Sequence, residues 1–159
     1  PFIKKNISIP IIAAGGISCG KSMLAAMSLG ADAVQIGSKF IASPESSAHQ
    51  NFKDYILNSK EGDTQLTLKE VTPVRLLKNE FFDKLMQAYD NGSSKEELKE
   101  LLGRGRAKKG MFMGDLVDGE LEVGQVSAAM DEIKPAAQIV NELVEEFNHA
   151  KNQLVKIQF

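Results

Sequence analysis

The chain has 159 residues, of which 43% are hydrophobic and 25% are charged, as in ordinary globular proteins. A formal net charge of −2 and a pI of about 5.8 give no electrostatic reason to expect nucleic acid or an anionic membrane as a partner. The single cysteine, Cys19, excludes an internal disulfide and a cysteine-based metal cluster, and favours a reducing, cytoplasmic setting. The longest apolar run, residues 9–14, is far shorter than the roughly 20 residues that cross a bilayer.

The first predicted element is a strand over residues 7–17, which are nearly all apolar. A strand that is apolar on both faces is typical of a parallel sheet covered on both sides. The sequence reaches this strand directly, without a start methionine or a signal-peptide pattern. We therefore expect the chain to be a piece of a longer protein.

A helix and a second strand follow. Apolar residues recur at helical spacing over residues 23–29, with Ser18 or Ser22 as the candidate cap, and Gly30 stands where a helix ends. Residues 31–37 are predicted to form the second strand. A strand, a helix of about ten residues and a strand predict a βαβ unit with parallel strands and a right-handed crossover.

The remaining residues are predicted to be mainly helical. Ser43 as N-cap and Pro44 at the first position predict a helix that continues to residue 57. Ser94 and Glu97 have the spacing of a capping box. The other expected elements are an extended segment over 65–75, helices over 81–89, 94–102 and 135–153, and a glycine-rich loop over 111–126.

Two glycine turns carry the chemistry. Gly15-Gly16 follows the first strand and Gly37-Ser38 follows the second, so parallel pairing places both turns at one edge of the sheet. Glycine lets a phosphate approach the backbone N–H groups, and in (β/α)8 enzymes the loops after strands 7 and 8 commonly hold a phosphate. The alternative is that each glycine only makes a tight turn.

Longer segments around these turns resemble the nitronate monooxygenase (2-nitropropane dioxygenase) family, whose flavin segment is shared with flavin-dependent enoyl-acyl-carrier-protein reductases. The resemblance covers nearly the whole chain. It is carried by residues 9–17, 29–40, 42–49, 113–115, 122–126 and 133–135.

The resemblance implies an α/β fold, the C-terminal part of a (β/α)8 TIM barrel with its last two parallel strands and an inserted small helical domain. The implied domains are residues 1–43 with the phosphate site, 44–130 on the substrate side, and 131–159 as the final barrel helix and tail. It implies FMN as the cofactor. The implied FMN-binding residues are Gly15, Gly16, Gln35, Ile36, Gly37 and Ser38. Threonine is commoner in the family at the position of Ser38, and serine keeps the hydroxyl.

The implied activity is oxidation of alkyl nitronates by O2, with enoyl-thioester reduction by NAD(P)H as the close alternative. An inosine-monophosphate-dehydrogenase-like barrel and a non-catalytic piece are further alternatives.

The family's histidine base precedes residue 1, so no catalytic residue is expected in this chain. The expected partners are the small-molecule substrate with O2 or NAD(P)H, without nucleic acid or membrane, and a homodimer is left open. Alone, the chain is expected neither to retain FMN tightly nor to turn over.

Other residues have weaker signals. We expect His49 to orient a helix or pack, and His149 to be solvated. Cys19 could be a thiolate at a helix N-terminus and Lys21 a phosphate contact, but a plain loop residue and a solvated lysine are the simpler interpretations. The same holds for the basic run 104–109, which could attract an acyl carrier, coenzyme A or a nicotinamide phosphate. No metal site is expected at Asp115, Asp118, Glu120 and Glu122, which lack the EF-hand order. Gln125 is left open as a flavin or substrate contact.

Overall fold

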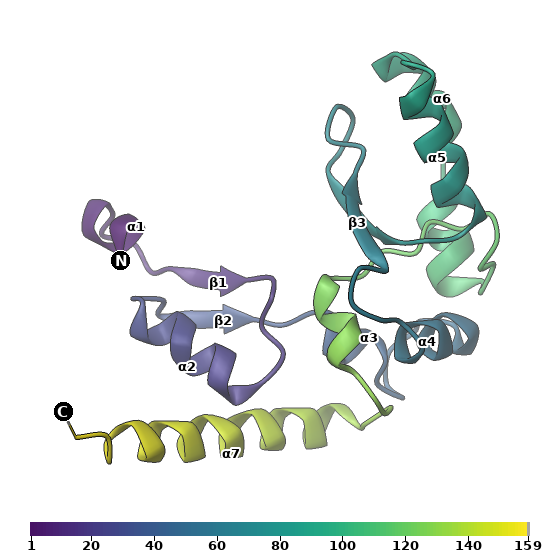
Figure 1. Ribbon diagram of the computed structural model, residues 1–159. Coiled ribbons are helices and arrows are strands. Elements are labelled where there is room, and N and C mark those ends of the chain that lie inside the picture. The colour runs from purple at the N-terminus through teal and green to yellow at the C-terminus, as the bar shows by residue number, and fades with distance from the viewer. Residues whose placement is uncertain (159) are drawn as a thin grey trace. The chain divides into compact units, whose positions relative to one another are not determined.

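The computed structural model describes residues 1–158, which form two compact units. The first unit is Pro1–Glu45 with the segment from Lys134 onward, and the second is Ser46–Ile133. Figure 1 shows the elements in chain order. They are α1 (Phe2–Asn6), β1 (Ile12–Ala14), α2 (Gly20–Ser28), β2 (Ala33–Gln35), α3 (Ser38–Ile41), α4 (Gln50–Leu57), β3 (Thr64–Thr67), β4 (Val74–Leu77), α5 (Glu80–Asp90), α6 (Lys95–Leu102), η1 (Lys108–Phe112), η2 (Gln125–Ala129) and α7 (Ala136–Leu154).

The first unit contains the βαβ motif that the sequence predicts. β1 and β2 are parallel, with Ile12 opposite Ala33 and Ala14 opposite Gln35. α2 connects them and packs against α7, and both helices lie along the strand pair (Figure 1). Gly20 allows this close packing, because a Cβ there would overlap the backbone of Phe147.

The prediction of a long, doubly covered first strand is wrong. β1 has three residues, α1 precedes it, and Ile9 and Ile12 are 66% and 62% exposed. Ladder hydrogen bonds need a neighbouring strand, and among residues 1–158 the only partner of β1 is the three-residue β2. The apolar side chains at the first strand therefore include ones that β2, α2 and α7 leave exposed to solvent.

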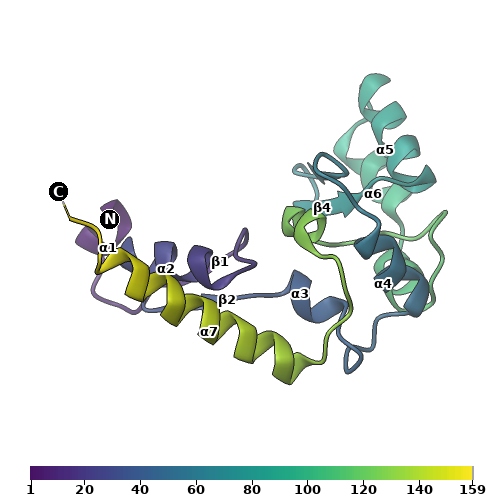
Figure 2. The same ribbon diagram turned by 60° about the horizontal axis from the view of Figure 1, so that its bottom comes forward.

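α7 is confirmed almost to its predicted ends, and Pro135 is its N-cap. Only part of its apolar stripe is buried. Ile139 and Leu143 pack inside the first unit, whereas Val140 and Val144 are about half exposed. Figure 2 shows α7 from a second direction, alongside α2.

The predicted helix start at Ser43-Pro44 is wrong. α4 begins at Gln50 with His49 as its N-cap, and residues 44–49 form turns. The Ser43 hydroxyl donates to the Phe40 carbonyl oxygen, within the turn that ends α3. The short helix α3 itself was not predicted from the sequence. The hydroxyl is therefore engaged with the preceding turn rather than with a helix that follows.

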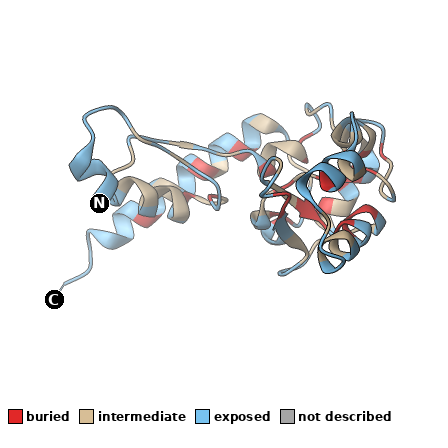
Figure 3. Cartoon of the chain, turned by 90° about the horizontal axis from the view of Figure 1, so that it is seen from above, coloured by how far each residue is buried: buried red, intermediate tan, exposed pale blue. Residues whose placement is uncertain are grey.

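The second unit is built around a β-hairpin rather than the single extended segment expected over 65–75. β3 and β4 are antiparallel, with Leu66 opposite Arg75. Figure 3 shows buried residues on this hairpin and on the helices of the same unit. The core cluster consists of Leu68, Leu76, Phe81, Phe82, Leu85 and Leu98. α5 and α6 have the predicted positions, and the Ser94–Glu97 capping box is confirmed.

The segment predicted as a glycine-rich loop is more ordered than expected. It contains the end of η1, and Glu122 forms an antiparallel bridge with Leu76. η2 follows at Gln125–Ala129 and packs near α4. Among residues 1–158, no helix is both long and apolar enough to cross a membrane.

Candidate functional site

The parallel register brings the two glycine turns to the same edge of the sheet. Ala14 and Gln35, the last residues of β1 and β2, lie opposite each other. Gly15-Gly16 therefore leaves the sheet beside Ile36-Gly37. Both turns follow the carboxyl ends of parallel strands, which is where open α/β sheets bind ligands.

The first turn has a backbone that only glycine adopts readily. Gly15 and Gly16 have φ values of +82° and +73°, and L side chains strain there. A Cβ built at Gly15, Gly16 or Gly37 would have no atom within 4 Å. The turns are thus open on the side where side chains would project, and this is the shape that a backbone cradle for a phosphate requires.

The second turn ends in a buried hydroxyl residue. Gln35 and Gly37 are exposed, Ile36 is half-buried, and Ser38 is 9% exposed as the first residue of α3. All six predicted site residues therefore lie on these two turns or on the strand and helix ends next to them, and the sheet register makes the turns neighbours.

Of the two predicted candidates, Ser18 and Ser22, it is Ser22 that holds the turn before α2. Ser22 Oγ accepts hydrogen bonds from the backbone N–H groups of Ser18 (3.2 Å) and Cys19 (3.1 Å), and it donates to the Cys19 carbonyl oxygen (2.8 Å). Ser22 is the third residue of the helix, so it completes a capping box with Cys19 as the N-cap.

Cys19 and its surroundings form a separate feature of this unit. Burial acts to raise the pKa of the Cys19 thiol, but hydrogen bonds with Ser22 and the Lys21 backbone outweigh it, and the pKa is lowered. Lys21 is exposed and lines a surface pocket together with Cys19 and His149. Across α2, the carboxylate of Glu146 accepts a 2.6 Å hydrogen bond from Gly20 N–H.

Neither histidine lies on the glycine turns. His49 caps α4, and its Nδ1 accepts a hydrogen bond from Asn51 N–H (3.1 Å), so the expected helix-orienting role is confirmed. His149 is exposed on α7, as predicted.

The basic run of the second unit is only partly the solvated face that the sequence favoured. Arg106 donates to the carbonyl oxygens of Leu101, Leu102 and Asp118, and its guanidinium lies 4.3 Å from the centre of the Phe81 ring. Two of these bonds satisfy the carbonyl oxygens of the last two residues of α6, Leu101 and Leu102. No sequence pattern indicates this role, because the acceptors are backbone oxygens.

The acidic residues of the same region pair with lysines. Asp115 contacts Lys109 (3.0 Å) and Asp118 contacts Lys84 (2.7 Å). The Asp118 backbone N–H and Lys109 together lower the pKa of Asp115 to about 2. Within the described part of the chain, His, Cys, Asp and Glu form no group of three or more that could hold a metal ion.

Comparison with known proteins identifies the family to which the chain belongs. The family model described as nitronate monooxygenase matches residues 1–146, which include both glycine turns and the whole second unit. The chain belongs to the nitronate monooxygenase family. This agrees with the resemblance that the glycine segments indicated.

Two curated relatives of this family are similar to nearly the whole chain. A probable nitronate monooxygenase of Staphylococcus saprophyticus is 35% identical over 155 residues, covering 96% of this chain and 43% of the relative. One from Staphylococcus aureus strain MSSA476 is 34% identical over 149 residues, covering 93% and 41%. The chain thus spans less than half the length of the curated relatives it matches.

Solved structures of family-like enzymes have the same fold. FabK from Thermotoga maritima is 36% identical with a TM-score of 0.87, over 96% of this chain and 49% of that one. Nitroalkane oxidase from Streptomyces ansochromogenes is 28% identical with a TM-score of 0.76, over 96% and 43%. The α/β fold is therefore that of these enzymes, and the two parallel strands are a part of it.

Proposed function

We propose that this chain supplies the last two strands of an FMN-binding (β/α)8 barrel that oxidises alkyl nitronates with O2. The observation that carries the proposal is the family match, which spans both open glycine turns at one sheet edge. The 1–43, 44–130 and 131–159 division expected from the sequence, with 44–130 on the substrate side, is part of the same proposal.

The residues present fit a flavin phosphate. Positive φ and open space at Gly15 and Gly16 allow the backbone N–H groups of the turn to reach an oxyanion. Gly37 extends the opening, and the Ser38 hydroxyl is a further donor for the same group. FMN, when bound, would supply the electron chemistry of the reaction, and the chain's own residues would bind and orient it.

The proposal includes no catalytic residue from this chain. Cys19, Lys21, His49 and His149 all have structural or solvent-facing positions. The proton-abstracting histidine of the family is proposed to come from the part of the barrel that precedes this sequence.

Enoyl-thioester reduction is the second candidate, and the likeness to FabK favours it. The test uses the full-length flavoprotein. We expect nitronate-dependent oxygen uptake to exceed NAD(P)H oxidation dependent on an enoyl thioester. Absence of oxygen uptake with every nitronate tried would exclude the first function. NAD(P)H oxidation that depends on an added enoyl thioester, in the same preparation, would establish the second.

A further inference from the structure

The second unit contains a surface cavity of about 600 Å³ that does not involve the glycine turns. It is lined by the turn before β3, by the hairpin residues Thr64 and Arg75, and by η2, which begins at Gln125. Its volume is in the range of small-molecule sites, 300–1,000 Å³. An alkyl nitronate of a few atoms would leave most of this volume empty.

Backbone pairing positions the walls of this cavity. Leu77 N–H donates to the Leu121 carbonyl oxygen (2.9 Å), and Val123 N–H donates to the Arg75 carbonyl oxygen (3.2 Å). The segment 121–123 therefore runs along β4, and this places Gln125 near the hairpin. Figure 2 shows the short green helix η2 beside β4.

Arg75 is held with its guanidinium oriented. Its Nη1 donates to the carbonyl oxygen (3.1 Å) and to the hydroxyl (3.2 Å) of Thr64, a neighbour on the same face of the hairpin. Within residues 1–158, Nε and Nη2 make no hydrogen bond to the protein, and no carboxylate lies within 4.0 Å of the guanidinium. A fork of donors thus stays available on a fixed group.

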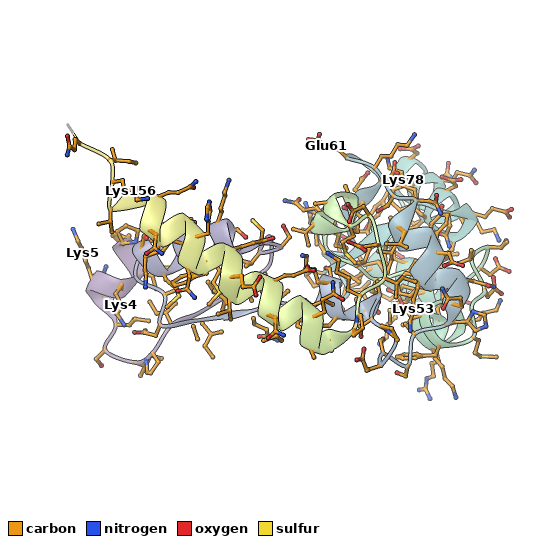
Figure 4. The ribbon with its side chains drawn as sticks, turned by 90° about the horizontal axis from the view of Figure 1, so that it is seen from below. Lys4, Lys5, Lys53, Glu61, Lys78 and Lys156 are labelled. Atoms are coloured by element: carbon orange, nitrogen blue, oxygen red, sulfur yellow. The ribbon has the colours of Figure 1, made fainter. Side chains whose placement is uncertain are left out.

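The charge of Arg75 is not balanced by the protein. The residue is half-buried, and a cation partly removed from water without an anion costs free energy. Glu61 is the acidic residue of the lining, but it is exposed, and Figure 4 shows it at the outer edge of the unit. An anion in the cavity would therefore meet Arg75 first.

We propose that this cavity binds a phosphate group carried by the substrate or by the electron donor, with Arg75 as its charged contact and the Gln125 amide as a hydrogen-bond donor. A guanidinium fork matches the oxygens of a phosphate, and such charge-assisted pairs are the strong ones. The proposal rests on the second candidate function, enoyl-thioester reduction, for the source of the phosphate. Thioester carriers and nicotinamide nucleotides both carry one.

The test is a titration of the ¹⁵N-labelled full-length flavoprotein, followed at the Arg75 Nε–H and Gln125 side-chain amide signals. We expect coenzyme A or NADPH to shift both signals, and the corresponding phosphate-free compounds, pantetheine and dihydronicotinamide riboside, to shift neither. Arg75→Gln should raise the Kd at least tenfold. Arg104→Gln, the same change at an exposed arginine of the basic run, should leave the Kd unchanged.

The outcomes separate the two sources and the alternatives. A shift with coenzyme A alone indicates a thioester carrier, and a shift with NADPH alone indicates a nicotinamide nucleotide. No shift with either, an unchanged Kd in Arg75→Gln, or an equal loss in Arg104→Gln would overturn the proposal. Arg75→Lys keeps the charge without the fork, and its expected intermediate Kd serves where Arg75→Gln does not fold. Since the signals do not need turnover, failure of enoyl-thioester reduction is seen separately, in the assay of NAD(P)H oxidation dependent on an enoyl thioester.

Discussion

The imidazole of His49 occupies the space that a side chain at Gly114 would need. A Cβ built on Gly114 would overlap His49 Nδ1, and Gly114 itself has a φ of +76°. The two residues are 65 positions apart, yet the Gly114 carbonyl oxygen also accepts a hydrogen bond from Asn51 Nδ2 (3.2 Å). The start of α4 and the 113–115 segment are therefore packed and hydrogen-bonded together.

This relationship predicts a large effect for Gly114→Ala. The positive φ and the overlap with His49 should together lower the free energy of unfolding by about 2–4 kcal/mol. Gly62→Ala is the matched control, because Gly62 has a φ of +89° with no atom within 4 Å of its Cβ position. It should cost about 1 kcal/mol. Urea unfolding measures both, and equal losses in the two variants would contradict a specific packing role for Gly114.

The Gly16 turn predicts a loss of cofactor with little loss of stability. In the full-length flavoprotein, Gly16→Ala places a methyl group in the open side of the turn and strains a φ of +73°. FMN affinity should fall at least tenfold, measured by equilibrium dialysis. Gly105→Ala shares the backbone strain, with φ +76° and open space, but lies in the second unit. If both variants lose FMN equally, the cradle assignment is wrong.

Glu146 is predicted to stabilise α2 from the neighbouring helix. Its carboxylate accepts from Gly20 N–H, one of the helix-start donors without an intrahelical acceptor. Glu146→Ala should therefore cost about 1–2 kcal/mol and speed amide hydrogen exchange at the start of α2. Glu145→Ala removes an exposed carboxylate next in the chain and should change neither quantity. Unaltered exchange in Glu146→Ala would show that the hydrogen bond contributes nothing.

Glu120 predicts a pH dependence of stability. Burial first, and then the nearby Glu122 carboxylate, raise the pKa of Glu120 from 4.5 to about 7. The folded chain therefore holds a proton that the unfolded chain releases. As pH rises from about 4.5 to 7 the chain should lose stability, by about 1–3 kcal/mol, and the loss should then level off.

The substitution Glu120→Gln tests this directly. It keeps the shape of the side chain without the charge, so it should flatten the pH dependence and raise the melting temperature at pH 8. Glu61→Gln removes an exposed carboxyl in the same unit and serves as the control. An unchanged pH profile in Glu120→Gln would assign the titration to another group, with Glu122, whose pKa burial also raises, as the first to examine.

Several features of this chain could be predicted because their causes lie within a few residues. The βαβ unit, α5, α6 with its capping box and α7 follow from periodicity and caps, which are local interactions. The glycine turns could be located because strand ends and glycines are adjacent in the sequence. The same locality explains the errors, since Ser43-Pro44 has the form of a helix start whose helix begins only at Gln50.

The amino-acid sequence was therefore sufficient to predict the strand-turn-helix pattern and, through the family resemblance, the residues that could cradle a phosphate. The three-dimensional arrangement was needed to show that Gly114 makes room for His49, that Arg106 reaches Asp118 and the Phe81 ring, and that Arg75 and Gln125 line one cavity. These arrangements join residues far apart in the chain, and periodicity and capping patterns describe only interactions between residues a few positions apart.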